Sequence, residues 1–497
     1  MPSRILFIIL WMLIQIQCLP QNAFEFAYST PDDDIVSESA LDNEGNVVLV
    51  GRIGKVIEKT SDAFILKIFP DGSYQEKRFV RQDTAGVFSR INILDDGDYF
   101  VMGSYSTENN SEAKDHLWIL IMTPEFEIIE ERFFMIPDGY LGYGDFANSI
   151  IDEEGHIALV SVAIRQYTHY RVGDFLLYKF TQQGDSLLTK LYPTFPEAWP
   201  HGFFQMPGTD SLLLIGKGYL QSGLESMNFM DKDMNISHGI SLSFLNSSKI
   251  YGNNIWLNDT DFLALGNRIV SINYSSRYFI SLFRMHKRGQ LLGELQLDRP
   301  DTIEYRAVNQ AMVLAGDSVI YVGAYQSYNL GWTTIPSTAV LYMVDIEMNL
   351  IGRANIGGDA NYLLMGIIVT PDNGVLAYGD SYTESGSFAR DIHVWKLRRK
   401  DFEIITKVIN MPEEATAASV WPNPANSVLN ISLAAFEQDE LLRLRIYNAK
   451  AQKYIDKQIK VTGNSLQAGI SNLPNGLYLY ELEAEHGLKQ TGRFLKQ

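Results

Sequence analysis

The sequence predicts an all-β protein, with a seven-bladed β-propeller followed by a small C-terminal Ig-like β-sandwich. Two observations predict the propeller: a short apolar run recurs at a nearly constant spacing, and each repeat has room for two hairpins. The sandwich is predicted because this rhythm stops after residue 410, and short strands alternating with turns fill residues 420–497.

The repeated run is a predicted strand that ends in a small residue. Its copies end at Gly51, Gly103, Ser161, Gly216, Gly266, Gly323 and Gly379. The mean spacing is (379 − 51)/6, or about 55 residues, which is typical of a repeat architecture. An apolar stretch and a turn rich in Asp, Asn or Gly precede the copies, and these turn residues tolerate the positive φ angles of hairpin turns.

A second hairpin follows the run, so that each unit reads as four strands. Residues 62–79, with the sequence DAFILKIFPDGSYQEKRF, are one such hairpin, and PDG is its turn. A four-stranded unit has two apolar faces and must pack against a neighbour on each side. A closed ring of seven units satisfies all of them. An array of two-sheet sandwiches is the alternative.

Closure of the ring requires one strand to occupy the outermost position of the last unit. Two segments compete for this position, Phe24–Ser29 near the N-terminus and Glu403–Ile409 at the end of the repeats. Both cannot occupy it. We expect Phe24–Ser29 to be the closing strand.

The N-terminal residues predict a secretory signal peptide over residues 1–23. Arg4 supplies a positive charge, and Ile5–Ile14 is an unbroken apolar run that is too short to span a bilayer comfortably. Cleavage between Cys18 and Ala23 would remove the only cysteine. Burial and strand pairing, rather than disulfides, would then stabilise the mature chain.

The composition indicates a globular, acidic protein. Hydrophobic residues make up 46% and charged residues 20% of the 497, which is consistent with a sizeable core. The formal net charge of −18 disfavours a nucleic-acid partner, because phosphate binding needs dense Lys and Arg. After the N-terminal run no apolar stretch reaches the length of a membrane span, so we expect no transmembrane span in the mature chain.

Residues 24–410 carry no recognisable catalytic or metal-binding signature. The eight histidines of the chain form no close metal-ligand pair, and neither a phosphate-binding loop nor a nucleophile elbow is found. The sequence therefore predicts no catalytic residue, no metal and no cofactor. Three hypotheses stay open. The protein is a binding module, or a purely structural surface protein, or a propeller-fold glycoside hydrolase or polysaccharide lyase, whose paired carboxylates only a structure could reveal.

Aromatic residues between the predicted strands suggest a binding surface. Propeller loops gather at the ends of the central channel, where aromatic rings can stack on sugars or anchor a protein partner. The candidate ligand contacts are Tyr140, Tyr143, Trp199, Tyr328 and Trp332. We expect a glycan or a surface protein as the ligand, and packing between blades is the alternative role for each ring.

The repeats resemble those of a loosely defined family of bacterial surface propellers. Residues 96–104, DGDYFVMGS, and residues 63–72, AFILKIFPDG, come closest to the family pattern. The resemblance covers about residues 24–410. It implies a propeller at the cell surface but no particular ligand.

A short polar linker, residues 411–419, leads to three distinctive blocks: WPNPA at 421–425, LRIYNAKAQKY at 444–454 and LPNGLYLYEL at 473–482. With these blocks in this order, residues 420–497 resemble the type A C-terminal sorting domain of the type IX secretion system of Bacteroidetes. One departure is Ala451, where the family usually has Gly. The alternative is an ordinary Ig-like adhesion module. The resemblance assigns the sorting motif to Pro422, Asn423, Pro424, Tyr447, Gly476, Tyr478 and Lys496.

This resemblance implies an export route. The signal peptide would lead to the periplasm, and the type IX translocon would recognise the folded C-terminal domain. The cargo would then be released or attached to surface lipopolysaccharide. We therefore expect a secreted or outer-membrane surface protein that binds a glycan or a protein ligand without catalysis.

Overall fold

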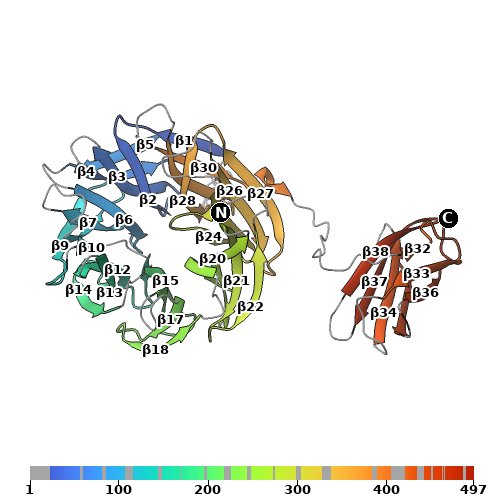
Figure 1. Ribbon diagram of the computed structural model, residues 1–497. Coiled ribbons are helices and arrows are strands. Elements are labelled where there is room, and N and C mark those ends of the chain that lie inside the picture. The colour runs from blue at the N-terminus through green and yellow to red at the C-terminus, as the bar shows by residue number, and fades with distance from the viewer. Residues whose placement is uncertain are drawn as a thin grey trace, which may run out of the picture. The chain divides into compact units, whose positions relative to one another are not determined.

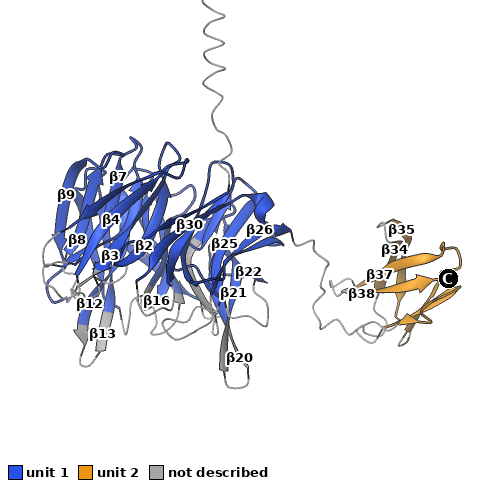
Figure 2. Ribbon diagram, turned by 90° about the horizontal axis from the view of Figure 1, so that it is seen from above, with its two compact units in different colours: residues 1–405 blue, residues 406–497 orange. Residues whose placement is uncertain are grey.

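The computed structural model comprises two compact units, residues 1–405 and 406–497 (Figure 2). The residues that it describes are 23–55, 60–80, 85–106, 116–140, 142–143, 148–167, 170–194, 199–217, 225–242, 248–272, 275–297, 304–326, 337–382, 389–404, 420–433, 441–448, 452–461, 463, 465–484 and 489–497. Among these residues there is no α-helix, only the short 3-10 helix η2 (Arg399–Asp401). None of their helices is long and apolar enough to cross a membrane.

Unit 1 is a β-propeller, in which antiparallel sheets follow one another around a central axis in chain order (Figure 1). Except in the sheet that closes the ring, the first strand in chain order lies nearest the axis and the later strands lie toward the rim. A single parallel bridge, Ser61 to Ala85, joins the first two sheets. These two sheets consist of β2 (Asp33–Leu41), β3 (Val47–Lys55), β4 (Thr60–Ile68) and β5 (Tyr74–Phe79), and of β6 (Ala85–Ile93), β7 (Tyr99–Ser106), β8 (His116–Met122) and β9 (Ile128–Met135).

The following sheets keep this order. They consist of β10 (Gly142–Tyr143), β11 (Asn148–Ile151), β12 (Ile157–Tyr167), β13 (Tyr170–Phe180) and β14 (Ser186–Tyr192); of β15 (Trp199–Gln205), β16 (Leu212–Lys217), β17 (Glu225–Met230) and β18 (Ile236–Ser241); of β19 (Ser248–Trp256), β20 (Asp261–Ile272), β21 (Ser275–His286) and β22 (Leu291–Gln296); and of β23 (Glu304–Arg306), β24 (Met312–Ala315), β25 (Val319–Gln326), β26 (Thr338–Asp345) and β27 (Leu350–Gly357). Two inner strands are split, since β10 and β11 both pair with β12, and β23 and β24 both pair with β25.

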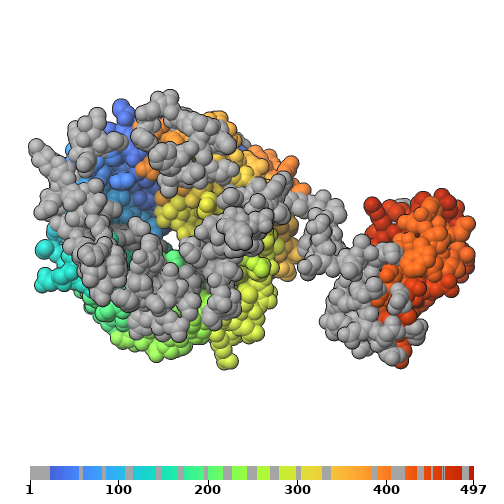
Figure 3. Space-filling view, viewed as in Figure 1, coloured from blue at the N-terminus to red at the C-terminus, as the bar shows by residue number. Residues whose placement is uncertain are grey.

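The last sheet of unit 1 combines strands from both ends of the unit. It contains β28 (Asn361–Val369), β29 (Val375–Tyr382), β30 (Asp391–Leu397) and, at the rim, β1 (Phe24–Tyr28), which pairs with β30. The expectation that Phe24–Ser29 closes the ring is thus confirmed, and Figures 1 and 3 show the blue N-terminal strands beside the orange ones. The competing segment pairs elsewhere, because its described part, β31 (Glu403–Ile404), adds to β27.

The core of unit 1 lies between consecutive sheets. Alternate side chains of a strand point to opposite faces. Ile119 of β8 belongs to the same buried cluster as Leu176 of β13, whereas the next residue, Leu120, lies in a cluster with Ile65 of β4. Each sheet therefore buries both of its faces, as expected for a unit that needs a neighbour on each side.

The glycine at the end of the repeated run has a structural cause. Gly51, Gly103 and Gly379 each pair with a residue at a β-bulge in the innermost strand. The bulge brings a backbone carbonyl against the glycine. A Cβ added at Gly51 would lie 2.0 Å from the Ile35 oxygen, and one added at Gly103 would lie 2.0 Å from the Val87 oxygen. Only glycine allows so close an approach.

Polar contacts support the junction of the first and last sheets of unit 1. Arg390 Nη2 lies 2.8 Å from Asp33 Oδ2, and the Val36 amide donates to Asp380 Oδ1 at 2.9 Å. Asp380 is buried. Burial raises the pKa of its carboxyl to about 7, although Arg390 and the Val36 amide act in the opposite direction. A carboxyl group that resists ionisation therefore lies where the ring closes.

Unit 2 consists of two sheets with one core between them. The first contains β32 (Val420–Trp421), β33 (Val428–Ser432) and β36 (Ser465–Gly469), and the second contains β35 (Lys453–Lys460), β34 (Leu441–Asn448), β37 (Gly476–Ala484) and β38 (Lys489–Lys496) in this order. Leu429 of β33, Leu444 of β34 and Phe494 of β38 are among the buried residues that the sheets share. Both sheets are antiparallel in their described pairings.

We expect Gly51→Ala to lower the free energy of unfolding of unit 1 by roughly 3 kcal/mol, because the new methyl group meets a backbone oxygen. Urea unfolding followed by tryptophan fluorescence measures the change. Gly54 in the same strand is the matched control, since a Cβ added there would lie 3.6 Å from its nearest neighbour. Gly54→Ala should cost less than about 1 kcal/mol. Equal effects at the two positions would contradict the role assigned to the bulge.

We expect Asp380→Asn to stabilise unit 1 relative to the wild type, and to do so more at pH 8 than at pH 5.5. The folded carboxyl has a pKa of about 7, whereas the unfolded one has a pKa of about 4. The folded state therefore binds more protons between these values, and the stability contributed by the protonated carboxyl is lost as the pH rises through 7. Asparagine does not ionise and still offers an acceptor to the Val36 amide.

Urea unfolding of both proteins at the two pH values measures this effect. The difference in unfolding free energy should grow by about 2 kcal/mol between pH 5.5 and pH 8. A difference independent of pH would contradict the raised pKa of Asp380.

Candidate functional site

The residues assigned to the sorting motif meet at one end of unit 2. Its opening block, Pro422–Pro424, runs alongside the last strand, β38. The Leu495 amide donates to Asn423 Oδ1 at 2.9 Å, and Ala425 exchanges backbone hydrogen bonds with Leu495 and Gln497 at 2.8 and 2.9 Å. This block thus covers the free edge of β38, which would otherwise present unpaired backbone groups.

The remaining motif residues lie on the neighbouring strands. Tyr478 is buried in β37, and its hydroxyl donates to the Pro474 carbonyl at 2.9 Å. Gly476 and Lys496 are register partners in β37 and β38. Tyr447 lies in β34, the other neighbour of β37. The structure therefore brings the three blocks of the motif together around β37 and β38.

One of the five aromatic residues proposed from the sequence, Tyr140, has a described side chain. Its hydroxyl donates to Asp174 Oδ2 at 2.6 Å, and Arg165 Nε donates to the same oxygen at 2.8 Å. The Tyr140 ring packs against a buried cluster between two sheets, so it has a role in the fold. The other four lie outside the described residues, Tyr143 and Trp199 with their side chains only and Tyr328 and Trp332 entirely.

A different group of side chains lies near the rim of unit 1, on the face of the second sheet that turns toward the first; two of them are exposed and two are half-buried. Tyr105, His116 and Met135 form the end row of this face on β7, β8 and β9. In the next row Phe133 lies nearly parallel to the buried Trp118, with 5.8 Å between ring centres. Phe133 is 38% and Met135 72% exposed. We call Tyr105, His116, Phe133 and Met135 the rim patch.

Polar groups border the rim patch. Trp118 Nε1 donates to Glu131 Oε1 at 3.1 Å, which holds this carboxylate two residues from Phe133 on the same strand. On the facing sheet Lys77 Nζ lies 5.6 Å from the ring centre of Phe79, and the Phe79 ring packs edge-on against Trp118 at 5.7 Å. Aromatic rings, a carboxylate and an ammonium group thus lie close together at this part of the rim.

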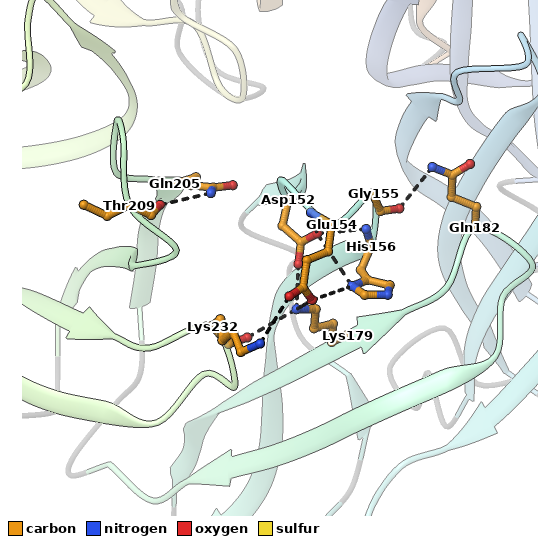
Figure 4. Close-up of polar contacts among 9 residues, drawn as sticks. All are labelled: Asp152, Glu154, Gly155, His156, Lys179, Gln182, Gln205, Thr209 and Lys232. Atoms are coloured by element: carbon orange, nitrogen blue, oxygen red, sulfur yellow. Dashed lines mark hydrogen bonds and ion pairs between the residues drawn. The ribbon is translucent and has the colours of Figure 1, made fainter.

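A second candidate is the cluster of Asp152, Glu154 and His156 in the turn between β11 and β12 (Figure 4). Their potential ligand atoms lie within 4.8 Å of one another. However, Lys179 Nζ lies 2.6 Å from Asp152 Oδ2, and Lys232 Nζ lies 3.2 Å from Glu154 Oε1. Two ammonium groups thus already neutralise the carboxylates, and the cluster is an ion-pair network.

The electrostatics of Asp152 support this interpretation. Burial alone would raise its pKa, but the hydrogen bonds from Lys179 and from the His156 amide outweigh burial and hold the pKa below its usual value. The same contact recurs in the first sheet, where Lys67 Nζ lies 3.0 Å from Asp42 Oδ2. Because the same Lys–Asp contact is found in two different sheets, it is a structural element of the repeat rather than part of a metal site.

The rim patch is not among the residues expected from the sequence, because those residues came from segments between strands. A signal for it was nevertheless present in β9, whose sequence is IIEERFFM. A strand at the rim should alternate between buried apolar and exposed polar side chains. Phe133 and Met135 share one face of this strand and are both exposed and apolar, which breaks that pattern.

Solved structures similar to this chain are distant. The β-propeller domain of the Trilobed protease from Pyrococcus furiosus is 12% identical with a TM-score of 0.39, over 78% of this chain and 99% of that chain. Penicillium chrysogenum alpha-L-arabinanase complexed with arabinobiose is 11% identical with a TM-score of 0.41, over 63% of this chain and 93% of that chain. Pyrococcus horikoshii acylaminoacyl peptidase is 11% identical with a TM-score of 0.42, over 84% of this chain and 59% of that chain. At these TM-scores the likeness carries no argument about function. No curated protein matches the sequence.

The C-terminal segment has a specific match. Residues 419–497 match the family described as secretion system C-terminal sorting domain. This agrees with the geometry of unit 2, in which the sorting motif covers and anchors the last strand. Residues 419–497 are therefore a sorting domain of the type IX secretion system, and the protein is exported to the cell surface or secreted.

Proposed function

We propose that this protein is a glycan-binding module, exported by a Bacteroidetes cell and attached to its surface or released. In this proposal residues 1–23 are a signal peptide, 24–410 a seven-bladed propeller, 411–419 a linker and 420–497 an Ig-like sorting domain; residues 1–22 lie outside the described residues. The blade count is supported by the strand groups β2–β5, β6–β9, β10–β14, β15–β18, β19–β22, β23–β27, and β28–β30 with β1.

The rim patch is the observation that carries the binding proposal. Clustered apolar side chains on the surface of a soluble protein mark interaction sites. Phe133 and Met135 are exposed, although Trp118 and Phe88 directly behind them are fully buried. Trp118 supports the Phe133 ring from one side. A ring that is held in place loses little conformational freedom when a ligand binds.

The chemistry of the rim patch favours a glycan. A pyranose packs its C–H face on an aromatic ring, and its hydroxyl groups need donors and acceptors nearby. Glu131 supplies a carboxylate beside Phe133, and His116 and Tyr105 lie in the adjoining row. A protein ligand is the second candidate, because the flexible thioether of Met135 is the most exposed apolar group of the patch.

We expect the double substitution Phe133→Ala and Met135→Ser to weaken glycan binding at least tenfold, because it removes the stacking ring and its apolar neighbour. A glycan array identifies ligands of the full chain, and calorimetric titration measures their affinity. Leu187 on β14 is a matched control, since it is 49% exposed at another part of the rim. Leu187→Ser should bind as the wild type does.

The outcomes separate the candidate functions. Full binding by the double variant would remove the rim patch from the proposal. Catalytic cleavage of a bound oligosaccharide would favour the glycoside hydrolase or polysaccharide lyase instead. An array without any ligand, together with capture of a surface protein that the double variant fails to capture, would favour the protein-binding candidate.

We expect Asn423→Ala to lower the free energy of unfolding of unit 2 by about 1 kcal/mol, because the Leu495 amide loses its acceptor. The exported fraction should fall as well, since the edge of β38 is less well held. Thermal unfolding and cell fractionation of the full chain measure the two effects. Asn423→Asp keeps an acceptor oxygen and should stay near the wild type. Identical behaviour of the two variants would contradict the role of this contact.

A further inference from the structure

The outward face of the second sheet of unit 2 has an apolar end. Side chains alternate along β37, so that Tyr478 and Tyr480 are buried whereas Leu477 and Leu479 are 47% and 49% exposed. Leu477 pairs in register with Leu495 of β38, which is 39% exposed. We call Leu477, Leu479 and Leu495 the leucine patch. The strands that carry it lie side by side in Figure 1.

Much of the rest of this face is charged, and several of these charges are paired. Arg493, the register partner of Leu479, is exposed beside the leucine patch. Arg445 of β34 lies 2.7 Å from both Glu481 and Glu483 of β37. Arg443 lies 2.8 Å from Asp456 of β35. Exposed ion pairs of this kind are hydrated and offer little apolar surface. The leucine patch joins three exposed apolar side chains on neighbouring strands, whereas the exposed Leu441 lies at the other end of β34.

The leucine patch adjoins the sorting motif. Asn423 Oδ1 accepts the amide hydrogen of Leu495, so the exposed Pro422 lies close to the strand that carries this leucine. Tyr447, another residue of the motif, pairs in register with Leu479. The motif thus holds in place the two strands that display the leucines, and it need not provide the whole contact itself.

We propose that the leucine patch is the surface by which this sorting domain docks on an apolar site of the type IX export machinery. The proposal rests on the sorting role of residues 419–497. Unit 2 has a complete core, so recognition of the folded unit must use side chains that folding leaves outside. Burial of three leucines favours association through the hydrophobic effect. A contact of this small size also suits a cargo that must dissociate again.

The test replaces Leu477, Leu479 and Leu495 together by threonine in the full chain, made in a host that has a type IX secretion system. Threonine retains a high preference for strands and removes apolar surface. Fractionation should show at least a tenfold fall in surface and secreted protein, with accumulation in the periplasm. Leu441→Thr is the matched control, because Leu441 is 38% exposed at the other end of β34. It should leave export unchanged.

Folding is measured separately, by thermal unfolding and protease resistance of the purified chain. The triple variant should unfold as the wild type does. If it does not fold, the single variants Leu477→Thr and Leu479→Thr replace it, and each should reduce export severalfold with unit 2 intact. Normal export of a folded triple variant would overturn the proposal. Loss of export in Leu441→Thr would also overturn it, because the effect would then be common to exposed leucines.

Two further measurements separate this proposal from the others. Deletion of residues 420–497 should abolish export, and export of the truncated chain would overturn the sorting role and the docking proposal together. The triple variant should keep its glycan affinity, because the rim patch belongs to unit 1, so failure of one proposal leaves the other standing. Light scattering tests whether a second copy of the chain covers the leucine patch instead. If the wild type is a dimer and the triple variant is a monomer that is still exported, the leucine patch serves self-association instead.

Discussion

Three sheets of the propeller depend on a close contact between a bulged inner strand and a glycine of the next strand. The bulges of β2, β6 and β28 lie opposite Gly51, Gly103 and Gly379, at the same place in each sheet. A bulge bends its strand and increases the local twist. Repetition of this bend in successive sheets gives the inner strands a common course along the axis. In these three repeats the glycine of the sequence pattern therefore marks a backbone contact that no side chain can enter. The third repeat has Ser161 at this position.

The turn after the inner strand is fixed in two chemically different ways. Asp42 and Lys67 form a buried ion pair in the first sheet. The turn of the second sheet has the same backbone hydrogen bonds, with Leu94 in the place of Asp42. Leu94 and Ile121, which take the places of Asp42 and Lys67, belong to one apolar cluster. The two positions differ together because a buried charge without its partner is strongly destabilising. Repeats can thus diverge in chemistry while the backbone geometry is kept, which explains why their similarity in sequence is weak.

Much of the fold follows from local pattern. The run that ends in glycine, the turn residues and the three C-terminal blocks are contiguous in sequence, and they were sufficient to predict the strand-rich repeats, the closing strand and the sorting domain. Pairings between distant segments were not predictable in the same way. Nothing in the dipeptide Glu403–Ile404 indicates that it pairs with β27 rather than with the last sheet. The rim patch depends on the register among β7, β8 and β9, which aligns Tyr105, His116 and Met135.

The rim patch and the leucine patch both have polar side chains as neighbours on the same strands, unlike the core. Neighbouring positions on the same faces of these strands are polar: Glu131 precedes Phe133 by two residues on β9, and Glu481 follows Leu479 by two on β37. The fold therefore tolerates a charged side chain at such positions. An apolar side chain gains free energy from folding only for the area that it buries, and part of Phe133 and of Leu479 stays exposed. The two proposed contacts, with a glycan at the rim of the propeller and with the export machinery at the sorting domain, would bury this remaining apolar area.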